Sequence, residues 1–235
     1  ARPEYITRLQ QNHKAGSTYS YAGFDQLVAV SSGIIRHFLA PAQEMYSLAI
    51  TELGANEDNI TSIKPSIQDE VIKKYSNNYL VGEFEKLKKD IDNNNTRQIQ
   101  LEKLYRMIDS LGQLFHLQLT SNSSERRVFS VAITDTPDDE MNEIIDMGEQ
   151  LGYFHKSTIG NKTGTGRNRL IILSRILAPH FKLDATSFAG YKFMDSAKLR
   201  MAMIDTKRFL AQFKFTEDDS SSVTQLLLFD GNNPI

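Results

Sequence analysis

The sequence contains no cysteine and no tryptophan among its 235 residues. Without cysteine, the chain can form no disulfide and can use no thiolate as a nucleophile or metal ligand. No apolar run approaches the roughly 18 residues of a membrane-spanning helix, and no signal peptide is visible. We therefore expect a cytoplasmic protein without a membrane partner.

A strong excess of one charge is also absent. The formal net charge is −2. Overall charge therefore indicates neither a general nucleic-acid binder nor an acidic-tail protein. The length suffices for one large domain or two small ones.

Motifs for catalysis and metal binding are missing too. The scattered histidines form no H-x-x-x-H pair with a third ligand, so we predict no metal site. No G-x-S-x-G nucleophile elbow occurs. The segment GNKTGTGR (160–167) lacks the spacing of a phosphate-binding loop and precedes a strand pattern instead of a helix. We predict no catalytic residue, and the question of an enzymatic role stays open.

Apolar periodicity and turn residues divide the chain into segments. The expected elements are helices at 24–28, 34–53, 67–91 and 98–119, a strand at 126–134, a helix at 136–152 capped by Thr136, a strand–loop–strand unit at 153–175, a mostly irregular segment at 176–193 and a helix at 195–213. In the second helix, Ile35, Leu39 and Tyr46 belong to one apolar stripe from which Arg36 points away.

This element order is typical of a winged-helix domain, although one helix stands where the usual helix-turn-helix has two. The sequence predicts a mainly α fold with a small antiparallel β wing, an α+β class. We expect a helical domain at 1–93, a degenerate winged-helix domain at 94–213 and a tail at 214–235.

Charge is unevenly distributed around the predicted wing. The stretch from Leu151 to Leu183 contains no acidic residue, whereas the preceding helix carries many. A local positive field of this kind favours phosphate backbones. The predicted nucleic-acid-binding residues are Lys156, Lys162, Arg167, Arg169 and Arg175. The alternative is that these cations pair with the acidic helix.

The segment YAGFDQLVAVSSGIIRHFLAPAQEMY (21–46) resembles the lid region of bacterial AAA+ ATPases of the origin-recognition-complex-like class. The segments LGYFHKST (151–158) and GRNRLIILSRILAPHFKLD (166–184) resemble the winged-helix region that follows that lid. The resemblance covers most of residues 20–195. It implies that Arg36 is the sensor-2 arginine, which reaches the γ-phosphate of ATP.

The Walker A, Walker B and sensor-1 segments of that class are not in the sequence, and Ala1 is the first residue. The resemblance places those segments upstream of the lid. We therefore expect no cofactor in this chain by itself, since ATP and Mg²⁺ would require an upstream ATPase core.

The tail contains QLLLF (225–229) after the polar stretch TEDDSSS. This pentapeptide resembles the motif with which bacterial replication and repair proteins dock on the sliding clamp. The resemblance implies polar contacts by Gln225 and pocket filling by Leu226, Leu228 and Phe229. The alternative is a strand that pairs with the sheet edge or packs on the core.

Two functional hypotheses follow. In the first, the chain is the regulatory, nucleic-acid-binding C-terminal portion of an AAA+ ATPase and contacts DNA through the basic wing. In the second, it is a protein-interaction scaffold whose winged helix and tail bind a sliding clamp or a defence complex.

Overall fold

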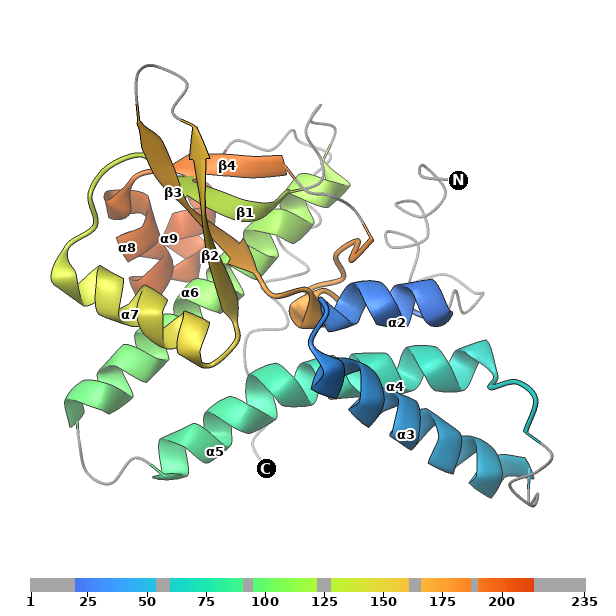
Figure 1. Cartoon of the computed structure of the whole chain (residues 1–235). Coiled ribbons are helices and arrows are strands. Elements are labelled where there is room, and N and C mark those ends of the chain that lie inside the picture. The colour runs from blue at the N-terminus through green and yellow to red at the C-terminus, as the bar shows by residue number, and fades with distance from the viewer. Residues whose placement is uncertain are drawn as a thin grey trace. The chain divides into compact units, whose positions relative to one another are not determined.

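The computed structural model of the chain describes residues 20–53, 60–90, 95–121, 128–160, 166–186 and 190–213. The described part is mostly helical with one small sheet, which confirms the predicted α+β class (Figure 1). The chain forms two compact units, the first of residues 1–86 with 175–187 and the second of residues 87–174 with 188–235. The first unit is therefore discontinuous in sequence. The division predicted at residue 93 treats each domain as one continuous segment.

The first unit is helical. Its elements are α2 (Phe24–Ser31), α3 (Ile35–Leu53), α4 (Pro65–Asn77), the π-helix η2 (Asn78–Gly82), the start of α5 (Glu83–Asp90) and the 3₁₀-helix η3 (Arg175–Leu177). Ser32 and Gly33 both have positive φ, 51° and 77°, and they make the tight turn between α2 and α3. Pro41 lies inside α3 without ending it.

The buried face of α3 differs from the apolar stripe in the sequence. His37, Pro41, Met45 and Ala49 are buried, in an i, i+4 row. Ile35 and Leu39 are instead 75% and 57% exposed. Apolar side chains are thus present on both rows, and the packing of α2 and α4 against α3 decides which row is covered.

The helix predicted at 67–91 is interrupted. α4 passes into the π-helix at Asn78 and resumes as α5 at Glu83. Gly82 permits this geometry, because a Cβ there would collide with the Asn78 side chain. Ile67, Val71, Leu80 and Phe84 are buried, as expected for the inner face of such a helix.

The second unit contains the sheet. Its elements are α6 (Asn95–Thr120), β1 (Val128–Ile133), α7 (Asp139–Gln150), β2 (Phe154–Gly160), β3 (Arg167–Leu173), β4 (Gly190–Met194), α8 (Ser196–Ile204) and α9 (Thr206–Ala211). The long helix α6 packs against α7, α8, α9 and β1 (Figure 1). Its apolar side chains, among them Leu104, Ile108 and Leu111, form the core of this unit.

The sheet is mixed, whereas the sequence predicted an antiparallel one. The strand order is β2-β3-β1-β4. β1 runs antiparallel to β3, with Val131 opposite Ile171, and parallel to β4, with Ala132 opposite Phe193. All six residues of β1, the strand between β3 and β4, are buried. The alternation in its sequence is therefore not an alternation of burial.

Three local expectations were wrong. β4 lies in the segment expected to be irregular. The helix predicted at 195–213 is two helices, separated at Asp205, whose side chain caps α9 by accepting a hydrogen bond from the Arg208 amide at 3.0 Å. The cap of α7 is Asp138, which accepts from the Met141 amide at 3.0 Å, and not Thr136.

Candidate functional site

Arg36 lies in the first turn of α3 and is exposed. No ion pair of Arg36 occurs within the described ranges. The turn at Ser32 and Gly33 fixes where α3 begins, and thereby where this guanidinium emerges. A cation in the first helical turn is unfavourable for the helix dipole unless an anion is nearby. The position suits a side chain whose partner is an anion.

Beside Arg36 lies an aromatic cluster of the buried His37 and Tyr79 and the partly buried Tyr75. The Nδ1 atom of His37 lies 3.1 Å from the Tyr75 hydroxyl. The His37 ring meets the rings of Tyr79 and Tyr75 edge-on, with centroids 4.8 and 5.9 Å apart. Burial, and to a smaller extent the charge of Arg36, lowers the pKa of His37 from 6.5 to about 4. His37 is therefore neutral at physiological pH.

The tyrosines of this cluster respond to the same charge. Burial raises the pKa of Tyr75 and of Tyr79, and the positive charge of Arg36 opposes that rise in both. Tyr79 belongs to the π-helix. The sequence analysis did not find this cluster. The only available signal was a histidine directly after the arginine, since the π-helix that supplies Tyr79 leaves no trace in apolar periodicity.

The predicted wing is the hairpin of β2 and β3. Its strands pair from Phe154 opposite Leu173 to Gly160 opposite Arg167. Along β3, the side chains of Arg167 and Arg169 continue the face that buries Ile171 and Leu173. Both arginines are exposed. Lys162 follows β2 in the sequence and lies outside the described residues.

Arg169 and Arg167 differ in their surroundings. A guanidinium nitrogen of Arg169 donates to the Asn142 side chain on α7 at 2.5 Å. That contact is to a neutral amide, so it leaves the charge of Arg169 uncompensated. In the described part of the chain, Arg167 forms no ion pair with a carboxylate. Among the described residues of the hairpin, these two side chains carry positive charge that no carboxylate compensates.

Lys156 is placed differently. Its Nζ atom lies 2.9 Å from an Asp146 oxygen and 2.5 Å from a Glu149 oxygen, both on α7. These hydrogen bonds raise the pKa of Lys156. The pairing of hairpin cations with the acidic helix, which the sequence left as an alternative, is thus observed at Lys156. Two carboxylates compensate this ammonium, so any role in binding DNA stays a prediction.

Arg175 is not part of the hairpin. It begins η3, and that helix belongs to the first compact unit. The structure therefore brings Arg167 and Arg169 together on one strand but does not place Arg175 with them. The sequence did not indicate that Arg175 is separate, because the chain passes from the second unit to the first directly after β3 without a change in charge pattern.

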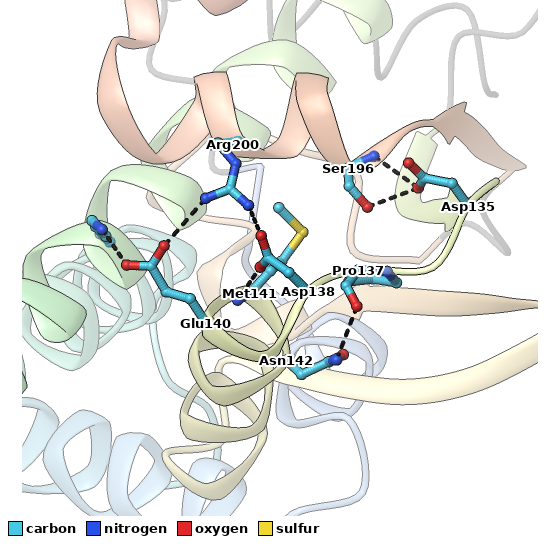
Figure 2. Close-up of polar contacts among 9 residues, drawn as sticks. Asp135, Pro137, Asp138, Glu140, Met141, Asn142, Ser196 and Arg200 are labelled. Atoms are coloured by element: carbon cyan, nitrogen blue, oxygen red, sulfur yellow. Dashed lines mark hydrogen bonds and ion pairs between the residues drawn. The ribbon is translucent and has the colours of Figure 1, made fainter.

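The acidic helix α7 is held by cations and by its own cap (Figure 2). Arg200 of α8 bridges Asp138 and Glu140, and its contact to Glu140 measures 3.2 Å. Glu140 also pairs with Lys103 of α6. The Asn142 side chain donates to the Pro137 carbonyl at 3.2 Å. Much of the negative charge of α7 is therefore compensated within the unit, and the contacts tie α7 to α6 and α8.

A second capping contact lies next to this network. The Asp135 side chain accepts from the backbone amide and the hydroxyl of Ser196, at 2.9 and 2.7 Å (Figure 2). Together with the cap of Asp195 on the Lys198 amide, it fixes the start of α8. These acidic residues have structural partners, and they do not converge on an open site.

The remaining predictions concern the tail, metal binding and the membrane. Gln225, Leu226, Leu228 and Phe229 lie outside the described residues. Within the described ranges, no group of three or more potential ligands could hold a metal ion. None of the described helices combines the length and the apolar character that a membrane crossing requires.

The described structure is that of a mainly helical protein with a small mixed sheet, an exposed arginine at a helix start and a basic hairpin. A family model described as ORC-CDC6-like matches residues 1–193. The chain belongs to this ORC-CDC6-like family and is an AAA+ ATPase-related protein. No curated protein and no solved structure gives a significant match.

Proposed function

We propose that this chain forms the lid and winged-helix-like part of an AAA+ ATPase-related protein, and that its β2–β3 hairpin binds the phosphate backbone of DNA. The observation that carries the proposal is the exposed pair Arg167 and Arg169 on one face of β3, without a carboxylate partner in the described structure. The Cα atoms of residues i and i+2 on one face of a strand lie about 7 Å apart, so both side chains can reach the phosphate backbone of one DNA duplex.

The acidic helix next to the hairpin would repel DNA if its charges were free. Lys103, Lys156 and Arg200 compensate carboxylates along its length. The usual recognition helix of a winged-helix protein therefore gives way to the hairpin as the contact surface in this proposal. Phosphate contacts of this kind supply affinity without reading sequence.

Fluorescence anisotropy with a labelled DNA duplex tests the proposal. The double substitution Arg167→Ala/Arg169→Ala is expected to weaken binding about tenfold or more at low salt and to reduce the slope of log K against log salt by about 2. A matched control removes two exposed lysines of the first unit, Lys64→Ala/Lys86→Ala, and is expected to leave the salt slope close to that of the unchanged chain. Equal losses in both double variants, or no loss in the arginine variant, would contradict the hairpin assignment.

The proposal gives Arg36 a nucleotide-sensing role. The guanidinium would reach a γ-phosphate that is held, together with Mg²⁺, by a Walker-type core that is not part of this sequence. Exposure of Arg36 and its lack of an ion pair within the described ranges support this. Isothermal titration of the chain with MgATP is expected to show no tight binding, since the phosphate cradle and the metal ligands are missing. Tight binding by the chain alone would contradict this assignment.

A second candidate function is protein binding, and the first unit favours it. Phe24 on α2 and Ile35 and Leu39 on α3 are 70%, 75% and 57% exposed. The ring of Phe24 on α2 lies against that of Phe38 on α3, with centroids 5.8 Å apart, so the exposed apolar side chains of the two helices are adjacent. Adjacent exposed apolar side chains of this size are typical of interaction surfaces.

The protein-binding candidate has two separable tests. Phe24→Ser/Ile35→Ser changes the α2–α3 surface, whereas deletion of residues 223–229 removes the proposed clamp motif. Binding to a purified bacterial sliding clamp that is lost only on deletion would support the tail. Unchanged clamp binding after the deletion would exclude that role for Gln225, Leu226, Leu228 and Phe229.

A further inference from the structure

The segment 175–187 leaves one strand of the sheet and returns to another, yet it belongs to the first unit. We call its described part, residues 175–186, the strap. Only Ser174 separates the end of β3 from the first strap residue. Three residues, 187–189, separate the strap from β4. Three residues span at most about 10 Å when fully extended, so both connections are short.

The strap is firmly held within the first unit. Ile176, Leu177 and Ala178 are fully buried. The Tyr21 hydroxyl lies 3.2 Å from the Ala178 carbonyl oxygen and 2.9 Å from that of Leu183, so one phenol faces both ends of the strap's central turn. The hydroxyl has one proton and donates to one of these oxygens at a time. Because the Ala178 carbonyl also accepts from the Leu183 amide at 2.8 Å, loss of the hydroxyl mainly affects the Leu183 carbonyl, and a buried carbonyl without a donor is costly.

Tyr21 is itself fixed in place. Its backbone amide donates to the Asp69 side chain on α4 at 2.9 Å. Asp69 in turn pairs with Lys73, one helical turn further on, at 2.6 Å. Tyr21 is 1% exposed. The anchor of the strap is therefore connected to the body of α4 and is not a surface contact.

A second contact holds the opposite side of the strap. The backbone amide of His180 donates to the Ser76 hydroxyl on α4 at 3.1 Å, and Ser76 is fully buried. The His180 ring lies 3.1 Å from the Asn77 side chain. α4 therefore holds the strap through Tyr21 at one place and through Ser76 and Asn77 at another.

At its two ends the strap continues into β3 and β4, which flank the central strand β1 on opposite sides. A displacement of the strap that exceeds what Ser174 and residues 187–189 can absorb must pull on one of these strands. We infer that the strap is a mechanical link which couples the conformation of α4 in the first unit to the order of β3 and β4 in the second. β3 is also the strand that carries Arg167 and Arg169.

The link is independent of the proposed DNA binding, since it depends only on chain connectivity and on hydrogen bonds within the first unit. Its prediction is a specific one. Loosening the strap at Tyr21 lowers the stability of β4 and of the end of β3 against local opening, and leaves α6 unaffected. Local opening energies of this kind differ between parts of one protein and are measurable at single amides.

Hydrogen exchange of the full chain under native conditions tests the link. The Tyr21→Phe variant removes the hydroxyl and keeps the buried ring. Amides of the strap are expected to exchange about tenfold faster, which corresponds to about 1.4 kcal/mol. The amides of residues 191–194 and of Leu173 are expected to accelerate by a comparable factor, whereas α6 amides such as Ile108 and Leu111 keep their protection.

Two further variants separate the link from general destabilisation. Tyr75→Phe removes another hydroxyl of α4 that contacts His37 and not the strap, and it is expected to leave β4 protection unchanged. Ser76→Ala removes the second strap contact and provides the same test if Tyr21→Phe fails to fold. Acceleration confined to the strap would overturn the inference. Equal acceleration in α6 and β4 would also overturn it, since the strap would then contribute only to overall stability.

Discussion

The Nδ1 atom of His37 lies 3.1 Å from the hydroxyl of Tyr75, and both groups sit beside the exposed Arg36. A neutral imidazole and a phenol satisfy each other there without a charge. The histidine is buried and also lies next to a cation. Burial and repulsion by Arg36 both disfavour protonation of the imidazole.

The pH dependence of stability follows from this site. The folded chain keeps His37 neutral down to a pH of about 4, whereas an unfolded histidine takes up a proton near pH 6.5. The unfolded state binds more protons within this window, so the free energy of unfolding rises with pH there, by roughly 3 kcal/mol for His37. Burial lowers the pKa of His180 to about 4 as well, so two histidines contribute.

Urea denaturation between pH 5 and 6.5 measures this slope. His37→Gln is expected to remove about half of the histidine contribution, as the second buried histidine keeps its own share. His180→Gln is the companion variant and is expected to remove the other part of the slope. A variant without His37 that retains the full slope would contradict the assignment.

The charge of Arg36 acts on its neighbours. Arg36→Ala is expected to raise the pKa of His37, because the guanidinium is one of the two causes that lower it. The pKa values of Tyr75 and Tyr79 are expected to rise as well, since the same charge favours their ionised forms. NMR titration of the variant measures the histidine directly. Stability at neutral pH is expected to change by no more than about 0.5 kcal/mol, because the side chain is exposed.

Release of Lys156 from α7 is expected to strengthen DNA binding. Asp146→Asn/Glu149→Gln removes both carboxylates that hold the ammonium and two negative charges beside the hairpin. Anisotropy at low salt is expected to show about three- to tenfold tighter binding, and the difference is expected to disappear at high salt. Glu52→Gln, which frees Lys64 in the other unit, is the control. No gain over that control would show that the hairpin does not face the DNA.

Gly148 is required by close packing of α7. A Cβ at this position would lie 2.9 Å from Leu104 Cδ1 and would collide with the Phe154 ring, and both neighbours are fully buried. Gly148→Ala is therefore expected to lower the free energy of unfolding by about 1–3 kcal/mol, even though alanine is the better helix former. Gly160→Ala, where nothing lies within 4 Å of the added methyl group, is the control. Chemical denaturation of both variants checks the difference.

Sequence reasoning located α6 almost completely, because nearly all of its apolar side chains, Ile99 excepted, face a core that surrounds much of the helix. It located the β2–β3 hairpin for a similar local reason, since glycines and a change of period mark the turn. It was wrong about α3, where two apolar rows compete, and about the cap of α7, where both Thr136 and Asp138 are residue types that cap helices. It missed β4, a five-residue strand that begins with glycine.

The sequence by itself determined the class of this protein: helices followed by a small β unit, an arginine at a helix start, and a basic segment beside an acidic helix. Those features depend on neighbours within a few residues. The tertiary structure decided which charges remain free, because the distance between Lys156 and α7 depends on how strand and helix pack. It also decided that residues 175–187 belong with the first unit, since contacts between residues distant in sequence leave no local pattern.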